Sequence, residues 1–91
     1  MYAVIFKATI KQFDSQYSEM VVHMRELAIN KYGCTEFTAC TEGDKEIAIS
    51  YWPSIEHINA WHQNPEHKAA QVLGKSKWYE SYQVQITEIL R

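Results

Sequence analysis

The sequence predicts an α+β domain of the ferredoxin-like class, a split β-α-β fold in which a four-stranded antiparallel sheet carries helices on one face. Three observations predict it. Residues near both ends alternate in the manner of strands, a turn divides two β-prone runs in the middle, and two other segments have helical apolar spacing after a capping residue. The 91 residues contain no repeat or linker, so residues 1–91 are expected to form a single domain.

The first strand and the first helix follow from residue spacing near the start of the chain. Residues 2–10 alternate with the period of a strand, and one parity is consistently apolar: Tyr2, Val4, Phe6, Ala8 and Ile10. Asp14 or Ser15 can cap the helix that comes next, because a short polar side chain accepts a hydrogen bond from the first free N–H groups. Gly33 is expected to end this helix.

The other three strands are expected in the middle and at the end of the chain. Residues 34–42 and 46–52 are rich in β-prone residues, and Gly43 begins the turn that joins them into a hairpin. Residues 83–90 alternate again and are expected to form the fourth strand.

The second helical region is predicted in two pieces. Ser54 can cap a short helix, and Asn64 before Pro65 is typical of a cap followed by a proline in the first turn. Gly74 weakens the second piece, so residues 75–82 are expected to form a separate turn or two. The resulting order, β-α-β-β-α-β, is that of the ferredoxin-like fold.

Composition and charge exclude several classes of protein. Nine Lys and Arg face eleven Asp and Glu without blocks of either sign, so a nucleic-acid partner is not expected. The longest apolar run, residues 2–6, is far shorter than the roughly 20 residues of a membrane span, and no charged leader precedes a cleavable apolar segment. We therefore expect no membrane partner and a cytoplasmic protein, with Cys34 and Cys40 as reduced thiols.

The sheet face without helices predicts a homodimer. A chain of this size hides only about 60 to 65% of its unfolded surface, so a lone subunit is marginally stable. We assign Ala3, Ile5, Ala48 and Ile89 to that open face, which makes it more apolar than a face exposed to water usually is. Two such sheets packed face to face would bury these side chains.

The second half of the chain resembles the antibiotic biosynthesis monooxygenase family. The resemblance lies between Ile49 and Leu90, in the residues Ile-Ser-Tyr-Trp-Pro-Ser, Ala60-Trp61-His62-Gln63-Asn64-Pro65-Glu66-His67 and Lys77-Trp78-Tyr79. It implies a dimeric α/β barrel in which each subunit keeps a pocket between its sheet and its helices. Some members of that family oxidise phenolic polyketides to quinones without metal, flavin or haem, and others degrade haem.

The resemblance also suggests where a site would be. The polyketide oxidisers carry an Asn four residues before a Trp and a Tyr six residues after it, and the same offsets here give His57, Trp61 and His67. Trp61 matches in type and is expected to wall the pocket. A histidine near neutrality suits removal of a phenol proton, so His57 and His67 are the candidate general bases. The alternative is that both are surface residues and that Trp61 only fills the core.

Three further residues complete the predicted site. Phe6 is expected to wall the pocket beside Trp61, and Tyr51 or Tyr79 to orient a substrate oxygen. The function that this predicts is a cofactor-independent monooxygenase acting on a small aromatic or quinol-like metabolite. The alternative is a non-catalytic, small-molecule-binding or stress-related dimeric α/β-barrel protein.

Haem or metal chemistry is not expected. In the haem degraders of this superfamily an iron-binding His follows the Trp by ten residues and an Asn lies on the first strand, and here those positions are Gln71 and Phe6. Haem binding or breakdown is therefore a minor alternative. His57, His62 and His67 are five residues apart, so their imidazoles would point in different directions on one helix, and no metal site is predicted.

Overall fold

A computed structural model describes residues 1–91 of the chain. The elements in order are β1 (Tyr2–Ile10), α1 (Ser15–Lys31), β2 (Glu36–Glu42), β3 (Lys45–Trp52), α2 (Ile55–His62), α3 (Pro65–Leu73), the π-helical turn η1 (Gly74–Trp78) and β4 (Tyr79–Glu88). With α2 and α3 as two pieces of one helical connection, this is the predicted β-α-β-β-α-β order. The α+β, ferredoxin-like fold is confirmed.

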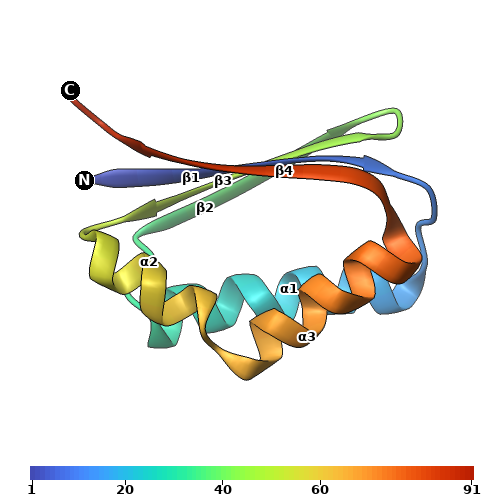
Figure 1. The fold of residues 1–91 in the computed structure, drawn as a ribbon, viewed down its shortest axis with the longest axis horizontal. Coiled ribbons are helices and arrows are strands. Elements are labelled where there is room, and N and C mark those ends of the chain that lie inside the picture. Colours follow the sequence, from blue (N-terminus) through green and yellow to red (C-terminus); the bar gives the residue numbers. More distant parts are fainter.

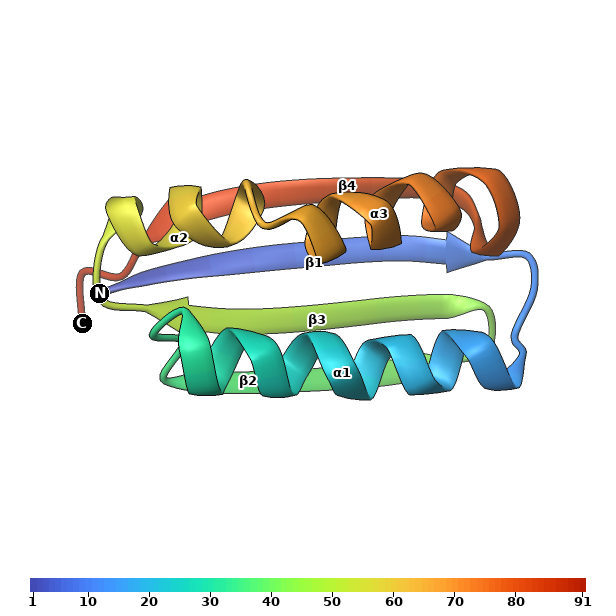
Figure 2. The same cartoon turned by 90° about the horizontal axis from the view of Figure 1, so that it is seen from below.

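The molecule has two layers, a sheet and a set of helices. The four strands are ordered β2-β3-β1-β4 and all neighbours are antiparallel. All helices lie on one side of the sheet and the other side is bare (Figure 1). Seen from below, α1 runs along β2 and β3, while α2 and α3 together run along β1 and β4 (Figure 2). No helix is long and apolar enough to span a membrane.

The strand register decides which side chains face the helices. Phe6 pairs with Ala48 on β3 and with Val84 on β4, and these three residues face the helix layer. The neighbouring row, which includes Ile5 and Ile49, faces the other way because successive strand residues alternate. We call that side the open face. Ala48 was predicted to lie on the open face, and this was wrong. Ala48 is the residue before Ile49 in β3, so its side chain points to the opposite side, toward the helices.

The open face carries an apolar strip in its centre. The strip runs along β1 and β3 and consists of Ala3, Ile5, Ile47, Ile49 and Tyr51. Ala3 is only 5% exposed, and the exposed Lys7 on β1, which pairs with Ile47, bounds the strip at that end. Polar residues flank it on the outer strands, among them Thr38 on β2 and Gln85 on β4. Ile47 is 45% exposed, which shows that nothing in the subunit covers this part of the sheet.

The helix starts are where the sequence predicts them. The side chains of Asp14, Ser54 and Asn64 accept hydrogen bonds from backbone N–H groups three residues ahead, at 2.8, 3.2 and 3.0 Å respectively. Gly33, just beyond α1, has a φ of +85°, a conformation that favours glycine. These local signals fix the ends of the helices and therefore the direction in which each enters the layer.

The last strand begins earlier than predicted. Residues 75–82 do not form a separate turn throughout, because η1 ends at Trp78 and Tyr79 already pairs with Ile10. Trp78 has no exposed surface, its carbonyl accepts a hydrogen bond from Lys11 N at 2.8 Å, and its ring packs against Tyr17 at a centroid distance of 5.2 Å. This anchor starts β4 directly after the π-turn. It also places Tyr79 at the edge of the helix layer.

Candidate functional site

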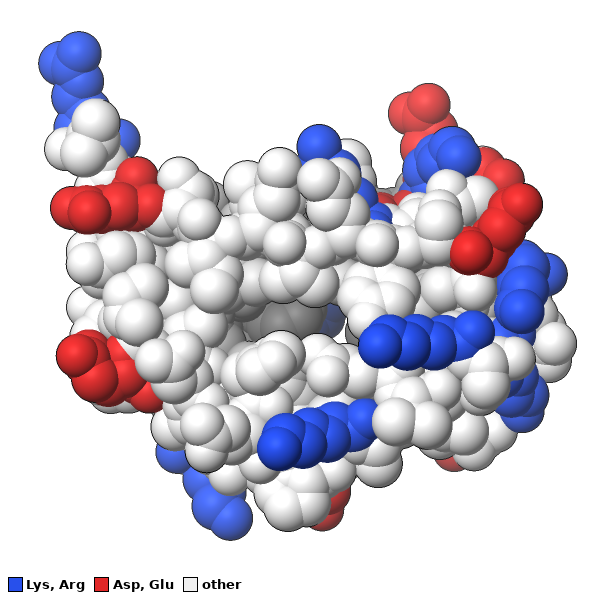
Figure 3. Space-filling model, viewed as in Figure 1, with Lys and Arg blue, Asp and Glu red and all other residues white.

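A cavity of about 270 Å³ lies between the sheet and the helices. Of its 22 lining residues 16 are hydrophobic, so an apolar molecule would be favoured over a highly charged one. Val84 and Ile86 line it from β4 yet remain 47% and 52% exposed, which places the mouth at this edge strand. Figure 3 shows the hollow between β4 and the layer of α2 and α3. Its volume lies near the lower end of ligand pockets, about 300 to 1,000 Å³, and suits a small metabolite.

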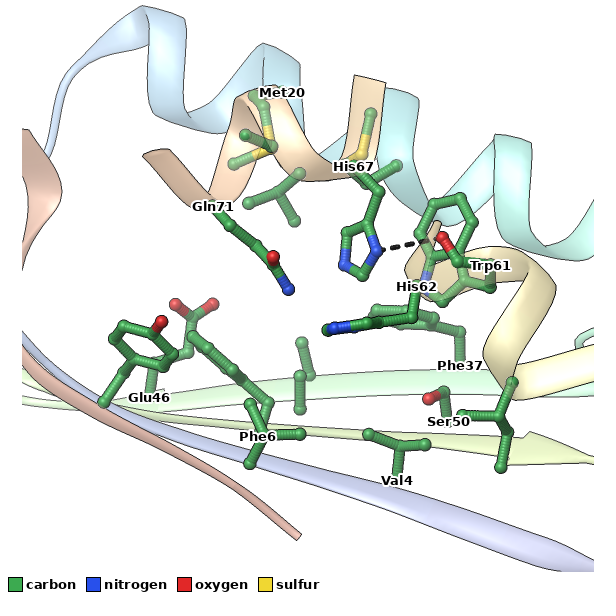
Figure 4. Close-up of a pocket in the computed structure, with 18 of the residues that line it drawn as sticks. Val4, Phe6, Met20, Phe37, Glu46, Ser50, Trp61, His62, His67 and Gln71 are labelled. Carbon is green, nitrogen blue, oxygen red and sulfur yellow. Dashed lines mark hydrogen bonds between the residues drawn. The ribbon is translucent and has the colours of Figure 1, made fainter. Parts of the chain in front are cut away.

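His67 lines the cavity and is held in one orientation. Its ring stacks on the indole of Trp61, with centroids 4.3 Å apart and an interplanar angle of 16°. Nδ1 lies 3.1 Å from the carbonyl oxygen of Trp61, so it donates a proton to that oxygen. The Trp61 carbonyl, in the last turn of α2, also accepts a hydrogen bond from Asn64 N at 3.1 Å, and a carbonyl oxygen can accept two hydrogen bonds. The other ring nitrogen, Nε2, points into the cavity (Figure 4).

The environment keeps His67 uncharged. Burial lowers the pKa of His67 below its ordinary value of 6.5, and the neighbouring His62 lowers it further by charge repulsion. The hydrogen bond to the Trp61 carbonyl opposes both effects without reversing them. Since Nδ1 carries the hydrogen in the neutral ring, Nε2 has a free lone pair directed at the cavity. This is the arrangement that a general base requires.

Trp61 is both a cavity wall and part of the core. It is 7% exposed and belongs to the main core cluster, where its ring stacks on Trp52 at a centroid distance of 6.2 Å and contacts Tyr32 at 5.4 Å. The face that His67 covers belongs to the cavity. Trp61 therefore both packs in the core and lines the cavity, as the two alternatives predicted separately.

Phe6 and Tyr79 form the opposite, aromatic end of the cavity. Their ring centroids are 5.3 Å apart, and Tyr82 lies 6.0 Å from each of them. Burial is the main cause that raises the pKa of Tyr79. Tyr79 therefore keeps its phenolic hydrogen at physiological pH and can donate or accept a hydrogen bond inside the cavity.

Gly74 allows the Tyr79 ring to occupy this place. A methyl group on Gly74 would lie 2.5 Å from Tyr79 Cε2, closer than carbon atoms can approach. Gly74→Ala is therefore expected to displace the ring and lower stability by about 1 kcal/mol, the overpacking cost of 1–3 kcal/mol less the helical preference for Ala. Thermal unfolding should show a fall of about 4–8 °C. The exposed Ser76→Ala in the same turn is the control; equal melting temperatures for the two variants would contradict this role.

Two of the predicted site residues lie outside the cavity. His57 was expected to share a face with Trp61, but it sits in the first turn of α2, where its Nδ1 lies 2.6 Å from Ser54 Oγ and its ring lies against Gly33. It lines only a shallow surface groove. Tyr51 pairs with Ala3 in the row that forms the open face, so strand alternation directs it away from the helices.

Five polar residues that line the cavity were not predicted from the sequence: Glu46, Ser50, Asn59, His62 and Gln71. Figure 4 shows His62 reaching in below His67, and Gln71 projecting between His67 and Glu46. Gln71 was considered only as a replacement for a haem ligand. Glu46 could have been found from alternation in β3, which puts it on the same face as Ala48 and Ser50. No group of three or more His, Cys, Asp or Glu side chains is placed to hold a metal ion.

The fold defines a class of protein. The chain superposes on SnoaB, a cofactor-independent oxygenase from Streptomyces nogalater, with a TM-score of 0.83 over 99% of this chain and 93% of that one, at 9% identity. It superposes equally well on a candidate antibiotic biosynthesis monooxygenase from Nitrosomonas europaea, with a TM-score of 0.82 over the full length of both chains at 15% identity. The resemblance to the antibiotic biosynthesis monooxygenases is thus confirmed at the level of the fold.

Sequence similarity then gives the family. The chain is 38% identical over 91 residues to the uncharacterised protein YqjZ of Bacillus subtilis (strain 168). The alignment covers 99% of this chain and 80% of YqjZ. The chain belongs to the same family as YqjZ. No family model matches the sequence.

Proposed function

We propose that this protein is a cofactor-independent monooxygenase that oxidises a small aromatic or quinol-like metabolite with dioxygen in the cytoplasm. The observation that carries the proposal is the state of His67. It is half-buried in the wall of an apolar cavity, its Nδ1–H is fixed on the Trp61 carbonyl, and its Nε2 lone pair is free to accept a substrate proton. The fold shared with SnoaB, itself a cofactor-independent oxygenase, supports the same reaction class.

The chemistry needs only the substrate, dioxygen and a base. Removal of the phenol proton by Nε2 gives an electron-rich anion, which reduces dioxygen far more readily than the neutral phenol does. One electron passes to dioxygen, and the resulting superoxide and substrate radical combine to form a carbon–oxygen bond. The hydroperoxide then loses water as the ring carbon gives up its hydrogen. In sum, a phenol and dioxygen become a quinone and water, and the proton on His67 returns to the departing oxygen.

The other cavity residues would position the substrate. Phe6 provides a flat apolar wall, and on the opposite side the Trp61 indole supports the stacked imidazole of His67, an arrangement that suits one or two fused aromatic rings. The un-ionised hydroxyl of Tyr79 can orient a substrate oxygen. These roles leave His57 and Tyr51 without a part in the reaction, because neither reaches the cavity.

We also propose that two subunits pack through their open faces. The apolar strip along β1 and β3 has no cover within the subunit, and antiparallel sheets of this kind bury such faces against a second layer. A second copy of the chain would supply that layer and form the barrel that the resemblance implies. The exposed Ile47 would be among the side chains buried.

A screen for oxygen uptake tests the proposed activity. Purified protein is mixed with hydroquinones, naphthols and hydroxyanthrones, and an oxygen electrode and a thermal-shift assay are read in parallel. We expect at least one compound to raise the melting temperature and to be oxidised with consumption of dioxygen. Stabilisation by ligands that are never oxidised would favour the non-catalytic binding protein instead. A shifted Soret band after addition of haemin would favour the haem alternative, which we do not expect.

The pH dependence of the reaction should follow the ionisation of the His67 imidazole. Because burial lowers its pKa, His67 stays in the base form at pH values where an exposed imidazole is protonated. The fall in kcat/KM on the acid side is therefore expected below pH 6.5, the ordinary value. Stability should also decline as pH falls through 6.5, since the unfolded chain then binds more protons than the folded one. An NMR titration of the ring, assigned with His67→Phe, measures the pKa directly; a value above 6.5 would contradict the assignment.

A further inference from the structure

Glu46 is a buried carboxyl group inside the cavity, and the proposed reaction does not use it. It lies near the start of β3, is 7% exposed, and its side chain points from the sheet toward the helix layer (Figure 4). Its only side-chain hydrogen bond is with Tyr17 on α1, whose hydroxyl donates to Oε2. That leaves Oε1 without a partner in the protein.

No cation accompanies this carboxyl group. The neighbours on its face of the sheet are Thr41 on β2, Ala8 on β1 and Tyr82 on β4, and the helix layer adds Tyr17. Tyr79 approaches from the start of β4. Lys45, the adjacent residue in β3, points to the opposite face of the sheet, where its ammonium group donates to Thr9 Oγ1 at 2.9 Å, and Lys75 lies over the Tyr82 ring, 5.7 Å from its centroid. All the groups that face Glu46 are therefore uncharged.

A carboxylic acid in such a place is cheaper to bury as the neutral acid than as the anion. Burial raises the pKa of Glu46, and no charged partner lowers it. An un-ionised carboxyl in an apolar site donates a hydrogen bond, as an acid beside a tyrosine does in some enzymes that stabilise an oxyanion. With Oε2 accepting from Tyr17, the hydrogen would reside on Oε1.

We propose that Glu46 is an un-ionised acid that donates a hydrogen bond from Oε1 to a carbonyl oxygen of the bound molecule. This rests on the proposed function, because it names the class of substrate that the same cavity takes. Glu46 and His67 lie on different sides of the cavity, with Gln71 between them (Figure 4). The matching ligand is an aromatic compound with an acidic hydroxyl at one end, facing His67, and a carbonyl oxygen at the other, facing Glu46.

Glu46 and His67 would each favour an aromatic ligand that carries both a hydroxyl and a carbonyl group. His67 accepts a proton from the hydroxyl, and the negative charge that results spreads through the conjugated ring to the carbonyl oxygen. A hydrogen bond from Glu46 strengthens as that charge develops, because donors in a water-excluded site stabilise an anion more than they stabilise a neutral oxygen. A phenol without the carbonyl would leave the Glu46 donor unpaired.

The binding test compares two probes and three proteins, without turnover. The probes are 2-hydroxy-1,4-naphthoquinone, which has the carbonyl, and 2-naphthol, which lacks it; the proteins are wild type, Glu46→Gln and Glu46→Leu. Calorimetric titration should show that Glu46→Leu binds the naphthoquinone about 5- to 20-fold more weakly than the wild type, because the buried carbonyl of the ligand loses its donor. The affinity of Glu46→Gln for the naphthoquinone should be nearly that of the wild type, because its amide still donates. Binding of 2-naphthol should not weaken in either variant.

A pH series separates the acid from its anion. Wild-type affinity for the naphthoquinone should fall as pH rises through the pKa of Glu46, while Glu46→Gln stays level over the same range. Infrared difference spectra of the free proteins should contain the C=O band of a neutral carboxylic acid at pH 7 that is missing from Glu46→Gln. Equal naphthoquinone affinity in wild type and Glu46→Leu, or a carboxylate band in place of the acid band, would overturn the proposal.

These readouts are independent of oxidation. If the naphthoquinone discriminates among the variants but no compound in the screen consumes dioxygen, the role of Glu46 stands and the monooxygenase proposal fails. If oxidation occurs but Glu46→Leu binds the naphthoquinone as tightly as the wild type does, the monooxygenase proposal stands and the role of Glu46 fails. Glu46→Leu leaves the buried Tyr17 hydroxyl without its acceptor, so we expect it to be less stable than the wild type. Glu46→Gln keeps an oxygen that accepts from Tyr17, so the pH series and the infrared comparison of wild type with Glu46→Gln test the proposal even if Glu46→Leu does not fold.

Discussion

Replacing His67 with Phe should lower the rate of oxygen uptake by about 10²- to 10⁴-fold, the usual contribution of a positioned general base. The phenyl ring keeps the stacking on Trp61 but has no lone pair to accept a proton, so the cavity persists while the base is lost. The loss should appear in kcat, with ligand affinity in the thermal-shift assay little changed. The measurement is the initial rate in the oxygen electrode with the best substrate of the screen.

His57→Asn is the matched control for this experiment. His57 is also a helical histidine in the same region, but it lies against Gly33 outside the cavity. Its replacement should leave oxygen uptake at the wild-type rate. If His57→Asn loses as much activity as His67→Phe, or if His67→Phe retains full activity, the assignment of the base to His67 is wrong.

If two subunits pack through their open faces as proposed, replacing Ile49 with Lys should leave the protein a monomer. Ile49 pairs with Ile5 in the middle of the open face, so a lysine there would place an unpaired charge at the centre of the interface. We expect the dissociation constant to rise by at least about a hundredfold, which corresponds to roughly 2.7 kcal/mol. Light scattering coupled to size exclusion measures the mass, and the melting temperature should fall with dissociation.

The control here is Val72→Lys. Val72 is 66% exposed on α3, which belongs to the helix layer and not to the open face. It should leave the mass unchanged. A wild-type protein that runs as a monomer at micromolar concentration, or an Ile49→Lys variant that stays dimeric, would remove the open face as the interface.

Most of the fold could be predicted because its signals are local. The caps at Asp14, Ser54 and Asn64 depend only on the few residues after each of them. Strand alternation in residues 2–10 reflects a face that the helices cover along its whole length. The assignment of Ala48 was wrong because both faces of β3 carry apolar side chains, Ile47 and Ile49 on one and Ala48 and Trp52 on the other, so alternation alone does not say which face the helices cover.

The site was harder to predict, because its residues converge through tertiary packing. His57 and Trp61 share a helical spacing, yet His57 is held against the end of α1 by Gly33, a contact that its own helix does not encode. His67 reaches Trp61 only because α2 ends at His62 and α3 begins in a new direction after Asn64. Glu46 was missed because a lone carboxylate in a strand is usually exposed.

The ionisation state of a bound phenol tests the central claim most directly. 4-Nitrophenol changes its visible absorbance when it loses its proton, and it can be titrated into the protein at a pH below its own pKa. If His67 Nε2 accepts the substrate proton, a larger share of the bound compound will be the coloured phenolate in the wild type than in His67→Phe, which has no base at this position. Identical spectra of the bound compound in the two proteins would contradict the account.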